Sequence, residues 1–505
     1  MKTRHGAIWL RRLAVGSAAG IVALLGAPVK AQPPVMSPPP PTATASGPHL
    51  SLSLVEAVFL GLRDNRTVKS AYIARVAQKY DLFVAETRFR PTAVLAASSQ
   101  STWQGGLGGA TTMINPTATW LAPTGAQFQF GWTRSDTHSP GADQISEVAS
   151  LSVKQPLLKG GGLAVNAAPI RVAELQERIN HLTLKSAVID TVTSIILAYR
   201  NLLQAQEQLV ITKESLDRSR AQLQTNQAMI DAGRMAAAEI VQTQADIANQ
   251  QVAALQAEQQ RNSAQLALLS LLAMDLHTNI VASDHLRADN VAVDLDQAVA
   301  IALDNRPDYL SQQRALEQAR QALIVAKNNR LWSLSVIGEV QRQTLSGAGS
   351  LVVNPATGLL APAASLSGTS GSVGLQLSIP LGDYTLEQGE VQATTNLRTQ
   401  EIELEDLRQT VEAQVRDAVQ GVEMARRQVE AARQARDLAA RTLDLERTRL
   451  EVGRASNFEV LSFEANLRAA DIQALSATIT YLNALTGLDQ QLGATLDTWK
   501  IQLND

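Results

Sequence analysis

The sequence predicts a mainly helical chain with a smaller membrane β part, built as two copies of one unit. Three observations predict this fold class: long heptad patterns, short segments that alternate apolar and polar residues, and a set of residues that recurs in the same order in the second half. Composition agrees. Only 4% of the 505 residues are aromatic, and Ala, Leu and Val diluted by Gln, Arg and Glu are typical of helices that bury a narrow seam.

The N-terminal end has the features of a cleavable secretory signal, residues 1–31. This segment carries five basic residues and no acid, and its apolar stretch from Leu13 to Leu25 ends near the small-residue site at Val29, Lys30 and Ala31. A transmembrane anchor is the alternative, but the apolar run is shorter than the ~20 residues that a spanning helix needs. Residues 32–50 hold seven of the 18 prolines, which predicts a disordered leader.

Charge and cysteine content exclude several classes of function. Without the signal the chain keeps 39 basic residues against 47 acids, which argues against a nucleic-acid partner. The absence of cysteine excludes disulfides and a lipid anchor on an N-terminal cysteine. No stretch after the signal approaches 18 uninterrupted apolar residues, so we expect any membrane crossing to use strands.

An internal duplication organises the rest of the chain. Three ordered anchors recur in the second half: Leu54, Ala57 and Val58 as Leu295, Ala298 and Val299; the stretch Leu151–Leu157 as Leu375–Leu381; and Gly233, Arg234, Glu239 and Ala245 as Gly453, Arg454, Glu459 and Ala465. We therefore divide the chain into a first unit, 51–285, a second unit, 286–490, and a C-terminal tail, 491–505. The expected strands lie at about 92–155 and 331–380, and the expected hairpin tips near 233 and 453.

Each unit contains one long helix with a coiled-coil seam. In the first unit the seam is predicted at intervals of seven, with a one-residue slip after Val210: Leu175, Leu182, Ile189, Ile196, Leu203, Val210, Leu216, Leu223 and Ile230. In the second unit it runs through Val415, Val422, Val429, Leu443 and Leu450. A helix from Asn166 to Asp231 spans roughly 100 Å. We expect the shorter helices 66–88 and 236–272 to stack end to end beside it.

Between the helices, several segments alternate apolar and polar residues as the strands of a membrane barrel do. Phe128, Phe130 and Trp132 are one such set, and Val373, Leu375, Leu377 and Ile379 are another. Four of the six tryptophans lie in these regions, which suits an interfacial girdle, with an ordinary sandwich core as the alternative. Bacterial barrels need at least about eight strands, and four or five are expected here. Several chains must therefore close one barrel.

The duplicated plan, the stretch Gln155–Leu158 before a long helix and the glycine turns resemble the TolC-type outer-membrane efflux protein family. The resemblance implies a homotrimer in the cell outer membrane. In it, four strands per chain form a shared 12-stranded β-barrel, and long antiparallel helices form a trimeric α-barrel in the periplasm. It also implies outer-membrane lipid as surroundings, and a periplasmic adaptor and an inner-membrane pump as partners.

The resemblance places the functional residues at the hairpin tips. Gly233, Arg234, Gly453 and Arg454 match the adaptor-docking tips, and Glu239 and Glu459 match the acids that line the pore gate. In a trimer these acids would form two rings that favour cations. The alternative is that both are solvated acids at helix starts, where the helix dipole favours them. The chain departs from the family at the second tip, because the family's gating arginine lies one residue later, at the place of Ala455.

The first unit also holds an additional strand-like stretch around Pro123, Thr124 and Gly125, which we interpret as an external-loop hairpin. An enzyme is not expected, because the six histidines have no metal-ligand spacing, cysteine is missing and no nucleophile motif or phosphate loop occurs. No cofactor, catalytic residue or metal site is predicted. The main alternative function is a periplasmic coiled-coil adaptor or scaffold, which would carry one hairpin.

Overall fold

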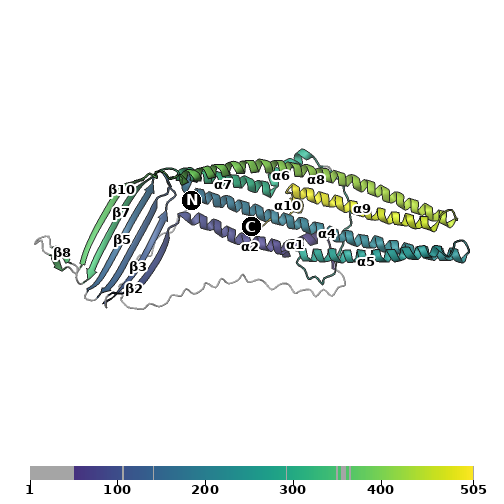
Figure 1. Cartoon of the computed structure of the whole chain (residues 1–505), viewed down its shortest axis with the longest axis horizontal. Coiled ribbons are helices and arrows are strands. Elements are labelled where there is room, and N and C mark those ends of the chain that lie inside the picture. The colour runs from purple at the N-terminus through teal and green to yellow at the C-terminus, as the bar shows by residue number, and fades with distance from the viewer. Residues whose placement is uncertain are drawn as a thin grey trace, which may run out of the picture. The chain divides into compact units, whose positions relative to one another are not determined.

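A computed structural model of the chain describes residues 50–503, except 105–106, 140–141, 292, 348–350, 354–359 and 363–364. The predicted signal and all of the predicted leader but Leu50 lie outside this range. The described part combines a six-stranded antiparallel sheet with long helices (Figure 1). Among the described residues, one helical stretch, Leu163–Asp231, is long and apolar enough to cross a membrane. Half of its most apolar segment, however, is buried inside the protein.

The helices of the first unit pack along one long helix. They are α1 (Leu54–Asp64), α2 (Arg66–Glu86), the 3₁₀ helix η1 (Thr87–Phe89), α3 (Leu163–Asn166), α4 (Ala168–Asp231) and α5 (Glu239–Leu271). Both α2 and α5 pack on α4. They meet end to end where the Asn65 side chain, which caps α2, donates to the carbonyl oxygen of Leu271 at 2.8 Å. The predicted stacking is confirmed.

The second unit repeats this plan with α6 (Leu295–Asn305), α7 (Pro307–Asn329), α8 (Thr385–Glu451), α9 (Asn457–Gln491) and α10 (Thr495–Thr498). Here α7 and α9 pack on the long α8. Arg306 at the start of α7 donates to the Gln491 side chain at the end of α9 over 2.9 Å, so this junction also joins two helices end to end. Four helical rods therefore lie side by side in each chain: α2 with α5, α4, α7 with α9, and α8.

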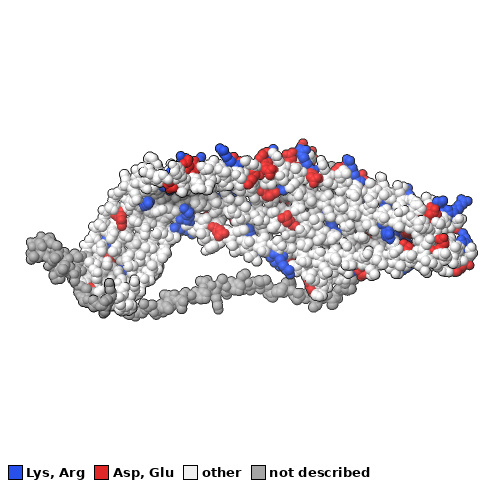
Figure 2. Space-filling view, viewed as in Figure 1, with Lys and Arg blue, Asp and Glu red and all other residues white. Residues whose placement is uncertain are grey.

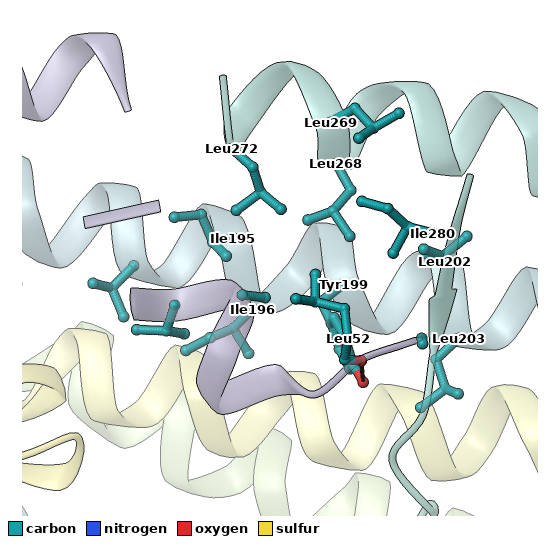
Figure 3. Packing of buried hydrophobic residues seen from close by; sticks show 14 of the residues in the cluster. Leu52, Ile195, Ile196, Tyr199, Leu202, Leu203, Leu268, Leu269, Leu272 and Ile280 are labelled. Carbon is teal, nitrogen blue, oxygen red and sulfur yellow. Dashed lines mark hydrogen bonds between the residues drawn. The ribbon is translucent and has the colours of Figure 1, made fainter. Parts of the chain in front are cut away.

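The central core lies where the small helices and short strands meet the rods. Side chains of α1, α4 and α5 interdigitate with β1 (Leu50–Leu52) and β6 (Ile280–Ala282), which pair in parallel (Figure 3). Tyr199 is buried there, and its hydroxyl donates to the Leu52 carbonyl oxygen at 2.9 Å. Burial raises the pKa of Tyr199 to about 12, so the phenol stays a neutral hydrogen-bond donor.

The two units are joined by a partly buried arginine. Arg200 of α4 donates to the carbonyl oxygen of Leu482 at 2.6 Å and to the hydroxyl of Thr486 at 2.7 Å, both on α9. Burial lowers the pKa of Arg200 to about 10, although the charge of Asp489 opposes this shift. The guanidinium therefore remains charged at neutral pH and is held by carbonyl and hydroxyl oxygens.

The main sheet has the order β10-β7-β5-β4-β3-β2, with every neighbouring pair antiparallel. Its strands are β2 (Thr92–Gln104), β3 (Leu107–Leu121), β4 (Gln127–Ser139), β5 (Ala142–Pro156), β7 (Ser333–Gly347) and β10 (Ser365–Ser378). A small separate pair, β8 (Leu351–Val353) and β9 (Leu360–Pro362), lies between β7 and β10 in sequence. The first unit thus supplies four strands of the main sheet and the second unit two.

Two expectations about this sheet were wrong. The resemblance implied four strands per chain, but β3 and β4 are full members, so the sheet has six. The predicted external loop around Pro123, Thr124 and Gly125 is instead a tight turn at the helix end, because the Gly162 N–H at the start of α3 donates to the Thr124 carbonyl oxygen at 3.0 Å. The strands on either side of this turn, β3 and β4, extend away from the helices through mainly polar residues, so apolar periodicity alone does not predict their full length.

In the half of the sheet nearer the helices, the six strands share one apolar and one polar face. Residues paired across strands point to the same side, and the row Ala93, Ala118, Phe130, Leu151 and Val340 runs across five strands. Phe130, Leu151 and Val340 are about half exposed in the single chain. The opposite face is polar and includes Thr117, Gln129, Ser150, Ser152, Glu339 and Gln341. Figure 2 shows few charged residues over the sheet, whereas charges gather on α8 and at the hairpin tips.

Candidate functional site at the hairpin tips

The two hairpin tips are built by the same local structure. Gly233 lies just after the end of α4 and has φ +70°, and Gly453 lies just after the end of α8 and has φ +76°. In both, the glycine and the following arginine donate backbone N–H groups to the last turn of the helix: Gly233 to Ile230, Arg234 to Met229, Gly453 to Leu450 and Arg454 to Arg449. This is the glycine cap that ends a helix through the left-handed region. It explains why the anchor recurs in both units.

The two tip arginines differ in their contacts. Arg234 donates through Nη2 to the backbone oxygen of Glu451, the last residue of α8, at 2.6 Å and so ties the first hairpin to the second. The exposed Arg454 side chain has no hydrogen bond or ion pair with another described residue. Arg454 is therefore the tip cation that remains available to another molecule.

Glu239 and Glu459 both lie in the first turn of the returning helices. Glu459 forms a capping box with Ser456: the Ser456 backbone N–H donates to the carboxylate at 2.7 Å, and the Glu459 N–H donates to the Ser456 hydroxyl at 3.2 Å. The backbone hydrogen bond from Ser456 holds the pKa of Glu459 below its usual value. Glu239 is the first residue of α5, which has no side-chain cap. The two acids therefore lie at similar places in their helices, but only Glu459 takes part in a helix cap.

Just behind the tips, a cluster of buried amides and hydroxyls links three helices. Asn226 of α4 is fully buried and donates through Nδ2 to Asn457 Oδ1 at 2.7 Å and to Thr243 Oγ1 at 2.9 Å. Asn457 of α9 in turn donates to Thr243 of α5 at 3.1 Å. We call these three residues the tip amide cluster. It fastens the first hairpin to the second with every bond out of contact with water.

A second link lies farther along the hairpins. The carboxylate of Glu464 in α9 has a side chain only 5% exposed, and it accepts from Arg218 of α4 at 3.1 Å and from Arg447 of α8. We call these three residues the carboxylate bridge. It joins α4, α8 and α9 because one acid is shared by two arginines. Buried ion pairs of this kind are costly to break, since a lone charge is left behind.

A cavity of about 230 Å³ opens at the tips, between the two hairpins, and is lined by Met229, Arg234, Glu239, Leu450, Ser456 and Asn457. Leu443, Leu450 and Val460 form the apolar floor of the tips. In the described part of the chain, no three His, Asp or Glu side chains gather as a metal site. The arrangement fastens the two hairpins to each other.

The sequence reasoning missed both links because the seam near the tip is polar. The predicted seam is confirmed at Ile189, Ile196 and Leu203, which are buried, but Val210 is 48% exposed. Leu216 is buried as the predicted slip requires, and beside it a second row of buried positions at intervals of seven is polar: Thr212, Ser219 and Asn226. A search for small polar residues in heptad spacing would have found them. In α8 all five predicted positions are buried.

Two hairpins fastened side by side, carried on rods that continue into an amphipathic sheet with open edges, define a segment of a channel wall. The sequence pattern of the outer membrane efflux protein family matches residues 62–274 and 298–494. The chain belongs to this family, whose members are outer-membrane channel proteins and not enzymes.

Solved structures with the same fold are channels of this kind. The Campylobacter jejuni CmeC outer membrane channel matches with TM-score 0.64 and 16% identity, over 88% of this chain and 86% of that one. The VceC outer membrane protein of Vibrio cholerae matches with TM-score 0.65 and 15% identity, over 87% and 96%. The open state of the Neisseria gonorrhoeae MtrE outer membrane channel matches with TM-score 0.64 and 16% identity, over 88% and 89%. A search among curated proteins found no match.

Proposed function

We propose that the protein is the outer-membrane channel of a tripartite efflux or secretion system. In this proposal three copies form a passive duct across the outer membrane and the periplasm, with residues 1–31 removed as a signal and 51–285 and 286–490 as its two repeats. An inner-membrane pump drives transport through a periplasmic adaptor. The observation that carries the proposal is the pairing of a six-stranded amphipathic sheet with two fastened helical hairpins in one chain.

The alternative, a periplasmic adaptor or scaffold, accounts poorly for two hairpins and for an apolar sheet face with half-exposed Phe130, Leu151 and Val340. Cell fractionation tests the choice. We expect the protein in outer-membrane fractions as a heat-modifiable oligomer that only detergent extracts. Recovery as a soluble periplasmic protein would contradict the proposal.

We propose that the tips are the gate and the docking site for the adaptor. The tip amide cluster and the carboxylate bridge hold the hairpins of one chain together, so opening requires movement around them. The MtrE channel, similar in fold, has been solved in an open state, which supports a gate that opens. Glu239 and Glu459 would line the entrance as acidic rings that favour cations.

The role of the tip acids can be separated from helix capping by substitution. Glu459→Gln removes the charge but keeps a side chain that can complete the capping box, and Glu239→Gln removes a charge that takes part in no cap. We expect both variants to lower cation preference in single-channel recordings without lowering thermal stability. Glu459→Ala should lower both. Unchanged selectivity in the two glutamine variants would leave both acids as helix-start residues only.

The docking role of the second tip is tested by crosslinking from Arg454. A photo-crosslinking residue at position 454 should capture one periplasmic protein in intact cells, because this exposed arginine has no partner among the described residues. The same residue at position 408, where Arg408 pairs with Glu405 on α8, serves as the control and should capture less. Equal capture at both positions would count against docking at the tip.

A further inference from the structure

The main sheet has two open edges. Among the described residues β2 and β10 each pair on one side only, and the other side presents a row of unpaired N–H and C=O groups. Such groups cannot stay unpaired in the hydrocarbon of a membrane, because no water is present to bind them. Six strands are also fewer than the roughly eight that the smallest bacterial barrels need. The sheet is therefore incomplete without another copy.

The two edges fit one another in direction and length. β2 follows η1 and runs away from the helices, whereas β10 runs back and leads into α8. When β10 of one copy lies beside β2 of the next, the pair is antiparallel, as every other pair in the sheet is. The strands have 14 and 13 residues, so nearly all their backbone groups find partners.

The faces fit as well. Leu95 on β2 and Val373, Leu375 and Leu377 on β10 belong to the apolar face that the strand register defines, and all four are more than half exposed in the single chain. A seam between β10 and β2 keeps these residues on one side and the polar residues on the other. In the half of the sheet nearer the helices, lipid would then meet a continuous row of apolar residues, and the lumen a polar surface.

The width of the sheet matches the width of the helical layer. Four rods at about 10 Å spacing are roughly 40 Å wide, and six strands at 4.8 Å, tilted by about 40°, are also roughly 40 Å wide. A ring of such rods can therefore continue into a barrel of six strands per chain without narrowing.

We propose that three copies close an 18-stranded barrel, with six strands from each chain and with β10 of every copy sealed against β2 of its neighbour. The inference rests on the trimer proposed above. Barrel diameter grows about linearly with strand number, so this barrel is about 1.5 times as wide as a 12-stranded one. Its lumen face is lined mainly by Ser, Thr and Gln side chains. The barrel would pass bulky polar solutes with little selection by charge, which leaves selection to the hairpin tips.

The test uses the full chain purified in mild detergent. Native mass measurement gives the number of copies, and electron cryomicroscopy gives the number of strands in the barrel. Three copies with 18 strands support the proposal. Three copies with 12 strands overturn it and leave the proposed channel intact, whereas one or two copies overturn the trimer itself.

Disulfide crosslinking tests the seam separately. Only introduced cysteines can react, because the chain has none of its own. Leu95→Cys combined in turn with Val373→Cys, Leu375→Cys or Leu377→Cys should give a covalent trimer on denaturing gels for at least one combination. Phe130→Cys, on the same face but in the inner strand β4, is the control and should give none with the same β10 variants. If no Leu95 combination crosslinks, or Phe130 crosslinks equally, the seam is not between β2 and β10.

Discussion

Gly125→Ala is expected to remove most of the assembled, heat-modifiable protein. Gly125 has φ +93°, and an added Cβ would lie 2.3 Å from the Gly160 carbonyl oxygen and 2.7 Å from Asn166 Nδ2. The oxygen is backbone and cannot turn away. Asn166 is held in place because its Nδ2 donates to the carbonyl oxygens of Gly160 and Gly162, at 2.9 Å each. Overpacking and backbone strain together should cost about 3 kcal/mol.

The matched control is Gly162→Ala. Gly162 has nearly the same φ, +98°, but a Cβ there meets nothing within 4 Å. The Gly162→Ala substitution should therefore cost only the backbone strain of a positive φ, about 1–2 kcal/mol of stability. The measurement is the yield of oligomer and its melting temperature in detergent. Equal behaviour of the two variants would mean that the turn between β3 and β4 does not pack against the start of the helices, contrary to the structure.

Glu464→Ala is the substitution expected to affect the hairpins most. It leaves Arg218 and Arg447 facing each other with no carboxylate between them, so the carboxylate bridge becomes a repulsive contact. Removing one partner of a fully buried pair costs 3–5 kcal/mol. Here the arginine side chains are 26% and 38% exposed, so solvent screens part of the effect and about 2 kcal/mol is expected.

The functional consequence should be a channel that opens more readily. We expect Glu464→Ala to raise the open probability in planar bilayers and to make cells more permeable to large antibiotics. Glu405→Gln is the control, because Glu405 pairs with Arg408 on the exposed surface of α8 and both side chains are more than half exposed. A closed, fully stable Glu464→Ala channel would show that the carboxylate bridge does not hold the hairpins.

The carboxylate bridge and the tip amide cluster both oppose separation of the two hairpins, the first through ion pairs and the second through hydrogen bonds between neutral groups. Asn226, Thr243 and Asn457 are buried, so their hydrogen bonds depend little on salt. The ion pairs of Glu464 involve partly exposed arginines, so they weaken as ionic strength rises. The hairpins are thus fastened near the tip by bonds insensitive to salt and farther along by bonds that respond to it.

The sequence alone determined the plan of this protein. Heptad spacing located α4 and α8, glycine positions located both tips, and helix lengths predicted the end-to-end stacking that Asn65 and Arg306 complete. These features could be predicted because each depends on residues close together in the chain, where periodicity and capping act. The resemblance then supplied the family, and with it the membrane and the expected partners.

Only the tertiary structure decided which residues hold the hairpins together and how many strands form the sheet. Asn226 and Asn457 are 231 positions apart, and neither is recognisable until two helices bring their amides into contact. Nor does alternation in a short segment tell whether Gly125 lies in an outer loop or in a turn at the helix end. That was decided by the packing of Gly125 against Gly160 and Asn166, because turn position depends on register across strands, which local pattern does not contain.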